Sequence, residues 1–298
     1  MLKISPKIIL KKLEEVNYFI NLETATILYL AIKLKKPILV EGPAGVGKTE
    51  LANSMRKAFD YDFVKLQCYE GIDESKSLYE WEYGKQLLYT QILKDRLNEI
   101  TKSKKLDKMV EDLSNFDTLF FSENFLLERP LLKAIRNKNR TLLLIDEIDK
   151  SEAEFEAFLL EILSEFQVTI PELGVIKNKQ IPLVILTSNA QRNISDALRR
   201  RALFLYLDYP DKELEKKIIK RKVPDLDDIS INKIVELISL IRSYPLKKAP
   251  GTSETIEWAN SLLFLGGLTP QNIKITINVI TKYKEDRDYI KARINDFL

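Results

Sequence analysis

The stretch Gly42-Pro-Ala-Gly-Val-Gly-Lys48-Thr49 matches the pattern G-x-x-x-x-G-K-[ST], and the interpretation of the whole chain starts from it. An apolar run at 37–40 precedes it and a helical pattern at 50–59 follows it, so its glycines fall between a strand and a helix. In this context glycines let backbone N–H groups surround phosphate oxygens, and the N-terminus of the next helix adds a favourable dipole. The stretch therefore predicts a phosphate-binding loop.

Two side chains of this loop have specific expected roles. Lys48 would reach the β- and γ-phosphates of a nucleoside triphosphate, and the Thr49 hydroxyl would ligate the Mg²⁺ that bridges them. We therefore expect ATP and Mg²⁺ as cofactors. The residues expected to bind the nucleotide are Gly42, Pro43, Ala44, Gly45, Val46, Gly47, Lys48, Thr49 and Glu50.

Asp146 and Glu147 directly follow the apolar run 142–145, which places two adjacent carboxylates at the end of a buried strand. The carboxyl ends of parallel strands share one edge of a sheet, where the phosphate loop must also lie. Asp146 would hold Mg²⁺ directly or through water, whereas Glu147 would orient and deprotonate the attacking water. The predicted metal ligands are thus Thr49 and Asp146, and Glu147 favours hydrolysis over binding alone.

Two further motifs end at the same predicted edge. Asn189 follows the apolar run 183–187 and could hydrogen-bond both the γ-phosphate and the attacking water, although asparagine is equally typical of a plain turn. The stretch 196–201 ends in three consecutive arginines, which could form an ordinary solvated helix end. They could equally offer a permanent charge to the ATP of a neighbouring subunit.

Apolar runs of strand length alternate with helical patterns over the first two-thirds of the chain. This alternation predicts an α/β fold, a three-layer domain with a five-stranded parallel sheet, over residues 1–210. Only helical periodicity follows, which predicts a small all-helical lid domain over 211–298. Asp211 and the pair Thr269-Pro270 fit the starts of the first and last of its helices. The expected strands are 37–40, 63–67, 142–146, 183–187 and 203–207, and the expected lid helices are 212–222, 232–243, 254–265 and 271–284.

Two stretches interrupt the alternation. The long stretch 69–140 contains a densely charged helical pattern at 94–114, which suits a solvated surface helix. The shorter stretch 167–182 has two brief apolar runs around the turn residues 171–174, which predicts a β-hairpin.

Composition excludes several classes of protein. The 298 residues carry 47 basic and 44 acidic side chains, and a net charge of +3 predicts neither nucleic-acid wrapping nor attraction to a membrane surface. The absence of histidine excludes a Ser-His-Asp triad and a His-ligated zinc site. The single cysteine, Cys68, excludes an intrachain disulfide and suits a buried filler in a reducing compartment. No signal peptide is recognisable at 1–14, and no apolar run reaches the ~18 residues of a membrane span, so we expect a cytoplasmic location.

These motifs, in this order and followed by helices, resemble the AAA+ ATPases over nearly the whole chain. Within that superfamily the chain looks like the MoxR family, in particular the members encoded beside carbon monoxide dehydrogenase genes. Ser151 and Glu154 also have the spacing of a capping box. The phrases that carry the resemblance are LQCYEG at 66–71, LYEW at 78–81, QLL at 86–88, FLLERPL at 125–131, EFEAFLLE at 154–161 and FQVTIPELG at 166–174.

The resemblance implies a homo-oligomeric ring, usually a hexamer, with ATP at the subunit boundaries and an arginine supplied in trans. Alignment with the family pattern puts this arginine at Arg201, with Arg200 close enough to contest it. The stretches 69–140 and 167–182 then look like pore-facing insertions. The resemblance further implies a chaperone-like remodelling motor for metalloenzyme maturation, acting on a protein client beside a von Willebrand factor A-domain partner.

One departure from the wider superfamily concerns the lid. Many members carry an arginine where this chain has Glu254-Thr255, and Lys247 or Lys248 could substitute for it.

Two other classes of function compete with a remodelling ATPase. A nucleic-acid-directed motor or loader would use the basic residues in Lys102-Ser-Lys104-Lys105, and its binding would be strongly salt-dependent. A nucleotide-gated scaffold would bind ATP with negligible turnover, which a measurement of phosphate release would reveal. Nucleic acid is the less expected partner because the charge balance is nearly even.

Overall fold

A five-stranded parallel sheet organises the first two-thirds of the computed structural model, which describes residues 4–101, 120–177 and 180–293. The strand order is β2-β5-β8-β1-β9. All five predicted strands are confirmed, each end within one residue of its prediction. The strands are β1 (Ile38–Glu41), β2 (Asp62–Gln67), β5 (Thr141–Asp146), β8 (Leu183–Ser188) and β9 (Leu203–Tyr206).

The register of the sheet brings the ends of its strands into line. Gln67 at the end of β2 stands beside Asp146 at the end of β5, and Glu41 at the end of β1 stands beside Ser188 at the end of β8. β1, β5 and β8 are buried along their whole length, as central parallel strands covered on both faces must be. The polar residues that end these strands therefore meet at one edge.

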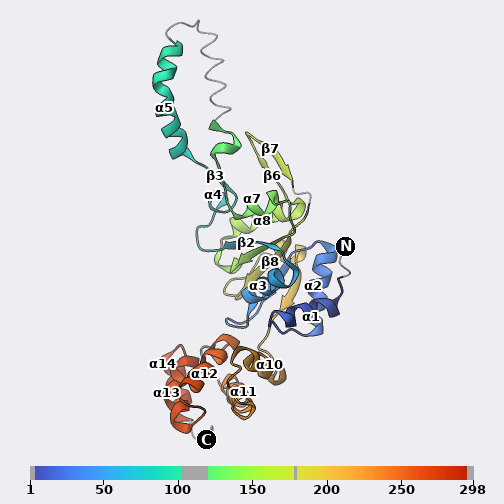
Figure 1. The fold of residues 1–298 in the computed structure, drawn as a ribbon, viewed down its shortest axis with the longest axis vertical. Coiled ribbons are helices and arrows are strands. Elements are labelled where there is room, and N and C mark those ends of the chain that lie inside the picture. Colours follow the sequence, from blue (N-terminus) through green and yellow to red (C-terminus); the bar gives the residue numbers. More distant parts are fainter. Residues whose placement is uncertain (1–3, 102–119, 178–179, 294–298) are drawn as a thin grey trace.

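Helices cover both faces of the sheet, so the fold has three layers (Figure 1). Alternate residues of one strand enter different cores: Leu142 and Leu144 pack with one group of helices, and Leu143 and Ile145 with the other. The first group is α1 (Pro6–Glu15), α2 (Leu22–Leu34) and α3 (Lys48–Phe59). The second is α7 (Pro130–Arg136), α8 (Ala153–Glu165) and α9 (Asp196–Arg201).

Two small sheets project from the same end of this α/β part (Figure 1). The predicted hairpin is confirmed as β6 (Gln167–Ile170) paired with β7 (Gly174–Lys177). In the longer insertion β3 (Tyr79–Trp81) pairs with β4 (Leu126–Glu128), and α5 (Tyr83–Thr101) extends farthest from the sheet. The charged helix predicted at 94–114 is described only as far as Thr101, and the basic residues at 102–105 lie outside the described residues. The short elements nearby are α4 (Glu74–Ser77), η1 (Glu123–Phe125) and η2 (Ile148–Lys150).

The C-terminal region is helical, as predicted, with a core of its own built around Trp258. Its helices are α10 (Lys212–Lys222), α11 (Asp228–Arg242), α12 (Thr252–Phe264), α13 (Pro270–Ile280) and α14 (Lys284–Ala292). The predicted caps are confirmed: Asp211 accepts a hydrogen bond from Leu214 N at 2.8 Å and Thr269 accepts one from Asn272 N at 3.2 Å. The expected boundary between two domains, at residues 210 and 211, falls between β9 and α10. Within the described ranges, no helix is both long and apolar enough to cross a membrane.

Three sequence predictions about helix ends were wrong. The single helix predicted at 271–284 is divided, because Thr281 is extended and its hydroxyl bonds back to Ile277 O at 2.9 Å. α11 starts four residues before its prediction because Asp227 caps it. The capping box at Ser151 does not form, since the Ser151 hydroxyl donates to Ile148 O at 2.8 Å and α8 begins one residue later than the box requires.

A buried ion pair joins three helices of the C-terminal region. Glu215 of α10, 1% exposed, accepts two hydrogen bonds from the Arg242 guanidinium of α11, at 2.7 and 2.8 Å. The Thr255 hydroxyl of α12 donates to the same carboxylate at 3.1 Å. The guanidinium also lies over the Tyr209 ring, 4.6 Å from its centroid, and so connects the helices to the segment that follows β9.

Replacing Arg242 by Ala should lower the free energy of unfolding by about 3–5 kcal/mol, because it leaves the Glu215 carboxylate buried and unpaired. Denaturant-induced unfolding would measure this. Replacing Lys216, whose partner Glu213 is exposed, should change it by less than about 1 kcal/mol. The double variant Glu215→Gln/Arg242→Met should be less destabilised than Arg242→Ala, and an equal loss would contradict the assigned role of the unpaired charge.

Candidate nucleotide-binding site

The phosphate loop lies between the end of β9 and the start of α12. Gly42 has φ 153°, and a Cβ added there would be 2.0 Å from the Leu207 carbonyl oxygen, so only glycine fits. On the other side of the loop, a Cβ on Gly45 would be 3.2 Å from Gly251 Cα. Ser253 N also donates to the Gly45 carbonyl at 3.2 Å. The loop is therefore held by both the sheet and the helical region.

Lys48 is the first residue of α3, and its ammonium is buried beneath the loop. It donates to the carbonyl oxygens of Gly42 and Pro43, both at 2.7 Å. Burial lowers the pKa of Lys48, and the negative charges of Asp149, Asp146 and Glu147 oppose that change. The expected phosphate-binding ammonium thus lies in the loop, where its hydrogen bonds are to backbone carbonyls.

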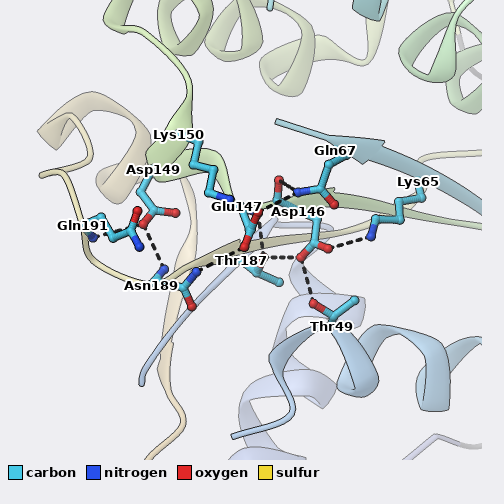
Figure 2. Close-up of polar contacts among 10 residues, drawn as sticks. All are labelled: Thr49, Lys65, Gln67, Asp146, Glu147, Asp149, Lys150, Thr187, Asn189 and Gln191. Atoms are coloured by element: carbon cyan, nitrogen blue, oxygen red, sulfur yellow. Dashed lines mark hydrogen bonds and ion pairs between the residues drawn. The ribbon is translucent and has the colours of Figure 1, made fainter. Parts of the chain in front are cut away.

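Asp146 is the centre of the polar contacts at the sheet edge (Figure 2). Its Oδ1 accepts hydrogen bonds from the hydroxyls of Thr49 at 2.9 Å and Thr187 at 2.6 Å, and its Oδ2 lies 2.8 Å from Lys65 Nζ. Burial, the largest influence, raises the pKa of this carboxyl, but the contacts from Lys65, Thr187 and Thr49 outweigh it, and the pKa is lowered. Asp146 is therefore ionised at neutral pH.

The pairing of Thr49 with Asp146 fits Mg²⁺. A hydroxyl and an ionised carboxylate are the oxygen ligands that this cation prefers, and it usually keeps several waters and binds substrate phosphates. Nowhere in the described part of the chain do three or more His, Cys, Asp or Glu side chains gather as a metal site. Any Mg²⁺ here would therefore depend on Thr49, Asp146 and the nucleotide itself.

Glu147 is held in position by its backbone and by its side chain. Its φ of 57° is a left-handed conformation that costs a non-glycine residue on the order of 1–2 kcal/mol. Its N–H donates to the Thr187 hydroxyl at 2.9 Å. Its Oε2 accepts from Gln67 at 2.9 Å and from Lys150 at 2.6 Å (Figure 2). Its Oε1 accepts from the Asn189 amide at 3.4 Å, the one hydrogen bond that it makes among the described residues. One carboxylate oxygen is thus firmly held and the other is lightly engaged.

The loop after β8 is fixed by a carboxylate that the sequence analysis did not single out. Asp149 Oδ2 accepts hydrogen bonds from the backbone N–H groups of Asn189 at 3.1 Å and Gln191 at 3.0 Å. Asp149 Oδ1 is buried, and among the residues that the structure describes it has no hydrogen-bond partner. Asp149 therefore sets the position of Asn189 relative to Glu147.

The three arginines of α9 have different surroundings. Arg199 pairs with the buried Glu41 at 2.6 Å, which fixes α9 to the end of β1. Arg201 donates to Leu160 O at 3.0 Å, and both Arg200 and Arg201 are exposed. Within the described residues, neither contacts the two carboxylates or the phosphate loop of its own chain. Their action on a neighbouring subunit stays a prediction.

A cavity of about 530 Å³ opens beside the phosphate loop, a size within the usual range for ligand sites. Its lining comes from the segment 17–21, the loop itself, the segment 206–211 that follows β9, and helices α10 and α12. Tyr18 donates to the Gly47 carbonyl at 3.1 Å, and burial, followed by the charge of Glu50, raises its pKa. The segment 17–21 carries no recognisable motif, so sequence analysis could not assign it to this site.

At the position of Glu254, where many superfamily members carry an arginine, we expected Lys247 or Lys248 to take the place of that arginine. The structure does not bring either lysine to the phosphate loop. Glu254 accepts a hydrogen bond from Gly251 N at 3.1 Å, next to the phosphate loop. The ammonium of Lys247 lies 3.3 Å from Glu285, and neither Lys247 nor Lys248 lines the cavity. The first turn of α12, rather than either lysine, is the part of the helical region that touches the loop.

The residues of this site lie within the part of the chain that matches a known protein family. A family model described as AAA domain (dynein-related subfamily) matches residues 37–202, which include the phosphate loop, both carboxylates and Asn189. Uncharacterised proteins of Staphylococcus saprophyticus and Staphylococcus aureus are 23% identical over 271 residues and 26% identical over 269. Each alignment covers 86% of this chain, with 88% of the first relative and 87% of the second.

Two solved structures also align with the chain. One is a candidate ATPase of Cytophaga hutchinsonii, with TM-score 0.47 and 19% identity, covering 98% of this chain and 93% of that one. The other is a RuvB variant of Thermotoga maritima, with TM-score 0.48 and 17% identity, covering 99% of this chain and 77% of that one.

Cys68 provides a chemical test of the electrostatics at this edge. The thiol is 1% exposed, and burial, reinforced by the charges of Asp146, Asp149 and Glu147, raises its pKa to about 12. Compared with a thiol at the ordinary cysteine pKa of 9.0, the thiolate fraction at pH 8 should fall about a thousandfold. We expect iodoacetamide to alkylate Cys68 rapidly in denaturant and extremely slowly in the native protein.

The same shift makes stability depend on pH. The stabilising contribution of the Cys68 thiol is fully present below its unfolded pKa of 9.0 and is lost as pH rises toward about 12, because only the unfolded chain can then form the thiolate. Comparable alkylation rates in the native and unfolded chains at pH 8 would contradict the assigned burial.

Proposed function

The chain belongs to the AAA domain family, in its dynein-related subfamily, and on that premise we propose that it hydrolyses ATP with Mg²⁺ to remodel a protein partner. The observation that carries the proposal is the placement of Glu147. Its carboxylate is held by Gln67 and Lys150 and contacts Asn189, and it follows directly in the chain on Asp146, which is bonded to Thr49. A site for binding alone would not need this second carboxylate.

The protein's own groups suit the steps of hydrolysis. Lys48 would leave the carbonyls of Gly42 and Pro43 and bind the β- and γ-phosphates. Mg²⁺, held by Thr49 and Asp146, would supply positive charge to the phosphate oxygens when bound.

Glu147 would then act as the general base. Gln67 and Lys150 hold its Oε2, so Oε1 is the oxygen available to take a proton from the attacking water. The Asn189 amide, 3.4 Å from Oε1, could orient the same water or the γ-phosphate.

Movement of the helical region would convert hydrolysis into work. The cavity beside the loop is lined both by the α/β part and by α10 and α12, so a bound nucleotide would contact both. The first turn of α12 already bonds to the loop through Ser253 N and Gly45 O. Nucleotide exchange or phosphate release would therefore bias the position of this region relative to the sheet.

We further propose a ring of identical subunits, most simply a hexamer of the MoxR type. Arg201 and its neighbour Arg200 are exposed and, in the part of the chain that the structure describes, contact neither Asp146 nor Glu147, which suits an arginine supplied to the next subunit. The insertions that carry α5 and the β6–β7 hairpin project from one end of the α/β part, where they could reach a client. A metalloenzyme client, an A-domain partner and a cytoplasmic location belong to this proposal.

Replacing Glu147 by Gln should retain ATP affinity within about threefold and reduce turnover about 100-fold or more, because the amide cannot accept the proton from water. Fluorescent-nucleotide titration and phosphate release would measure the two effects. Replacing the exposed Glu154 by Gln serves as the control and should change neither. Unchanged turnover in the Glu147 variant would remove the carboxylate from the mechanism.

Replacing Arg201 by Ala should reduce turnover by up to about 10³-fold, through loss of charge stabilisation in the transition state. Mixing this variant with Lys48→Ala should partly restore turnover, since the Lys48→Ala subunits would present an intact arginine to the intact phosphate loops of their neighbours. Arg200→Ala, tested in parallel, would identify the finger if it alone impairs turnover. Mixed rings that form, as judged by light scattering, but remain inactive would exclude action in trans.

A further inference from the structure

Two side chains of β2 each hold one of the two adjacent carboxylates. Lys65 and Gln67 are two residues apart in the strand and therefore project from the same face. Lys65 Nζ lies 2.8 Å from Asp146 Oδ2, and Gln67 Nε2 lies 2.9 Å from Glu147 Oε2. Because Gln67 stands directly beside Asp146 in the register, β2 is in place to contact both carboxylates.

The lysine contact uses the free oxygen of Asp146. Oδ1 already accepts hydrogen bonds from the Thr49 and Thr187 hydroxyls, so Lys65 takes the remaining oxygen of a buried carboxylate (Figure 2). Over the described ranges, no other lysine or arginine lies within 4.0 Å of this carboxylate. The ammonium of Lys48 is bonded to the loop carbonyls instead.

We propose that Lys65 is a positioning residue that competes with Mg²⁺ for Asp146 and thereby sets how strongly ATP binding depends on Mg²⁺. This inference rests on the proposed function, since it concerns the same nucleotide site. The site contains an ammonium that must move for Asp146 to turn its Oδ2 toward a cation.

The other two residues that contact Asp146, Thr49 and Thr187, have less mobile side chains than Lys65. Both hydroxyls belong to short side chains on α3 and β8, whereas the Lys65 side chain is long and 40% exposed. Lys65 can therefore swing into solvent while the hydroxyl contacts stay in place.

The charge of Lys65 weakens the binding of Mg²⁺ and strengthens the binding of Mg²⁺-free ATP. The positive charge of Lys65 beside Asp146 reduces the gain in free energy from bringing a divalent cation to the same carboxylate. The same charge favours the binding of Mg²⁺-free ATP, which carries more negative charge than the magnesium complex. Lys65 should thus narrow the difference in affinity between ATP with and without Mg²⁺.

Lys65→Met and Lys65→Arg test the inference through binding rather than turnover. ATP affinity would be measured by calorimetry over a series of free Mg²⁺ concentrations and in EDTA. Lys65→Met should lower the half-saturating Mg²⁺ concentration about threefold or more and weaken ATP binding in EDTA by a similar factor, because one positive charge is lost. Lys65→Arg keeps the charge and should lie close to the unmodified protein.

Lys150→Met gives a matched comparison, since it removes the same charge from the neighbouring carboxylate, where Lys150 lies 2.6 Å from Glu147 Oε2. It should shift the Mg²⁺ titration less than Lys65→Met does. An equal shift would overturn the inference, because it would make the effect one of total charge rather than of contact with Asp146. Thermal unfolding of each variant would verify that it is folded.

The remaining outcomes separate this inference from the proposed function. If the unmodified protein binds Mg-ATP but its Mg²⁺ titration coincides with that of Lys65→Met, or lies at lower Mg²⁺ than that of the variant, the role of Lys65 is rejected while the proposed function stands. If the unmodified protein binds no ATP at any Mg²⁺ concentration, in calorimetry or with a fluorescent nucleotide, both proposals fail.

Discussion

The Asp146 carboxylate is the contact on which the arrangement of this site depends. Three elements reach it: α3 through Thr49, β8 through Thr187 and β2 through Lys65. Burying a carboxylate is unfavourable unless its oxygens are satisfied, so these donors are a condition of the fold as well as parts of the site. The start of the helix that follows the phosphate loop is thereby fixed to the centre of the sheet.

Much of this arrangement could be predicted because it rests on strong local patterns. Uninterrupted apolar runs identify the central strands, and the parallel order then brings the polar residues that end them to one edge. The contact between Thr49 and Asp146 follows from two motifs 97 residues apart. Lys65 and Gln67 were missed because β2 is an edge strand with a largely uncovered face, where polar residues are expected anyway. The cavity segment 17–21 contributes shape rather than a motif, so its role depends on tertiary packing alone.

The errors at helix ends have a common physical cause. The side chains of Ser151, Asp227 and Thr281 can each form a hydrogen bond with several nearby backbone groups. The differences in free energy between these alternative hydrogen bonds are small. Periodicity predicts which face of a helix is buried, but a single hydroxyl or carboxylate decides where the helix begins or ends. The site is little affected, since its residues lie at strand ends whose position is set by burial of the sheet.

The close approach of Gly42 to Leu207 has a mechanical consequence. Leu207 opens the short segment that leads from β9 into α10, and this segment is also a wall of the nucleotide cavity. The wall of the cavity and the connector between β9 and α10 are thus formed by the same few residues. A ligand that presses on this wall would therefore act directly on the connector between β9 and α10, and no separate relay is required. The same proximity leaves no room for a side chain: a methyl group at Gly42 would push on the connector itself.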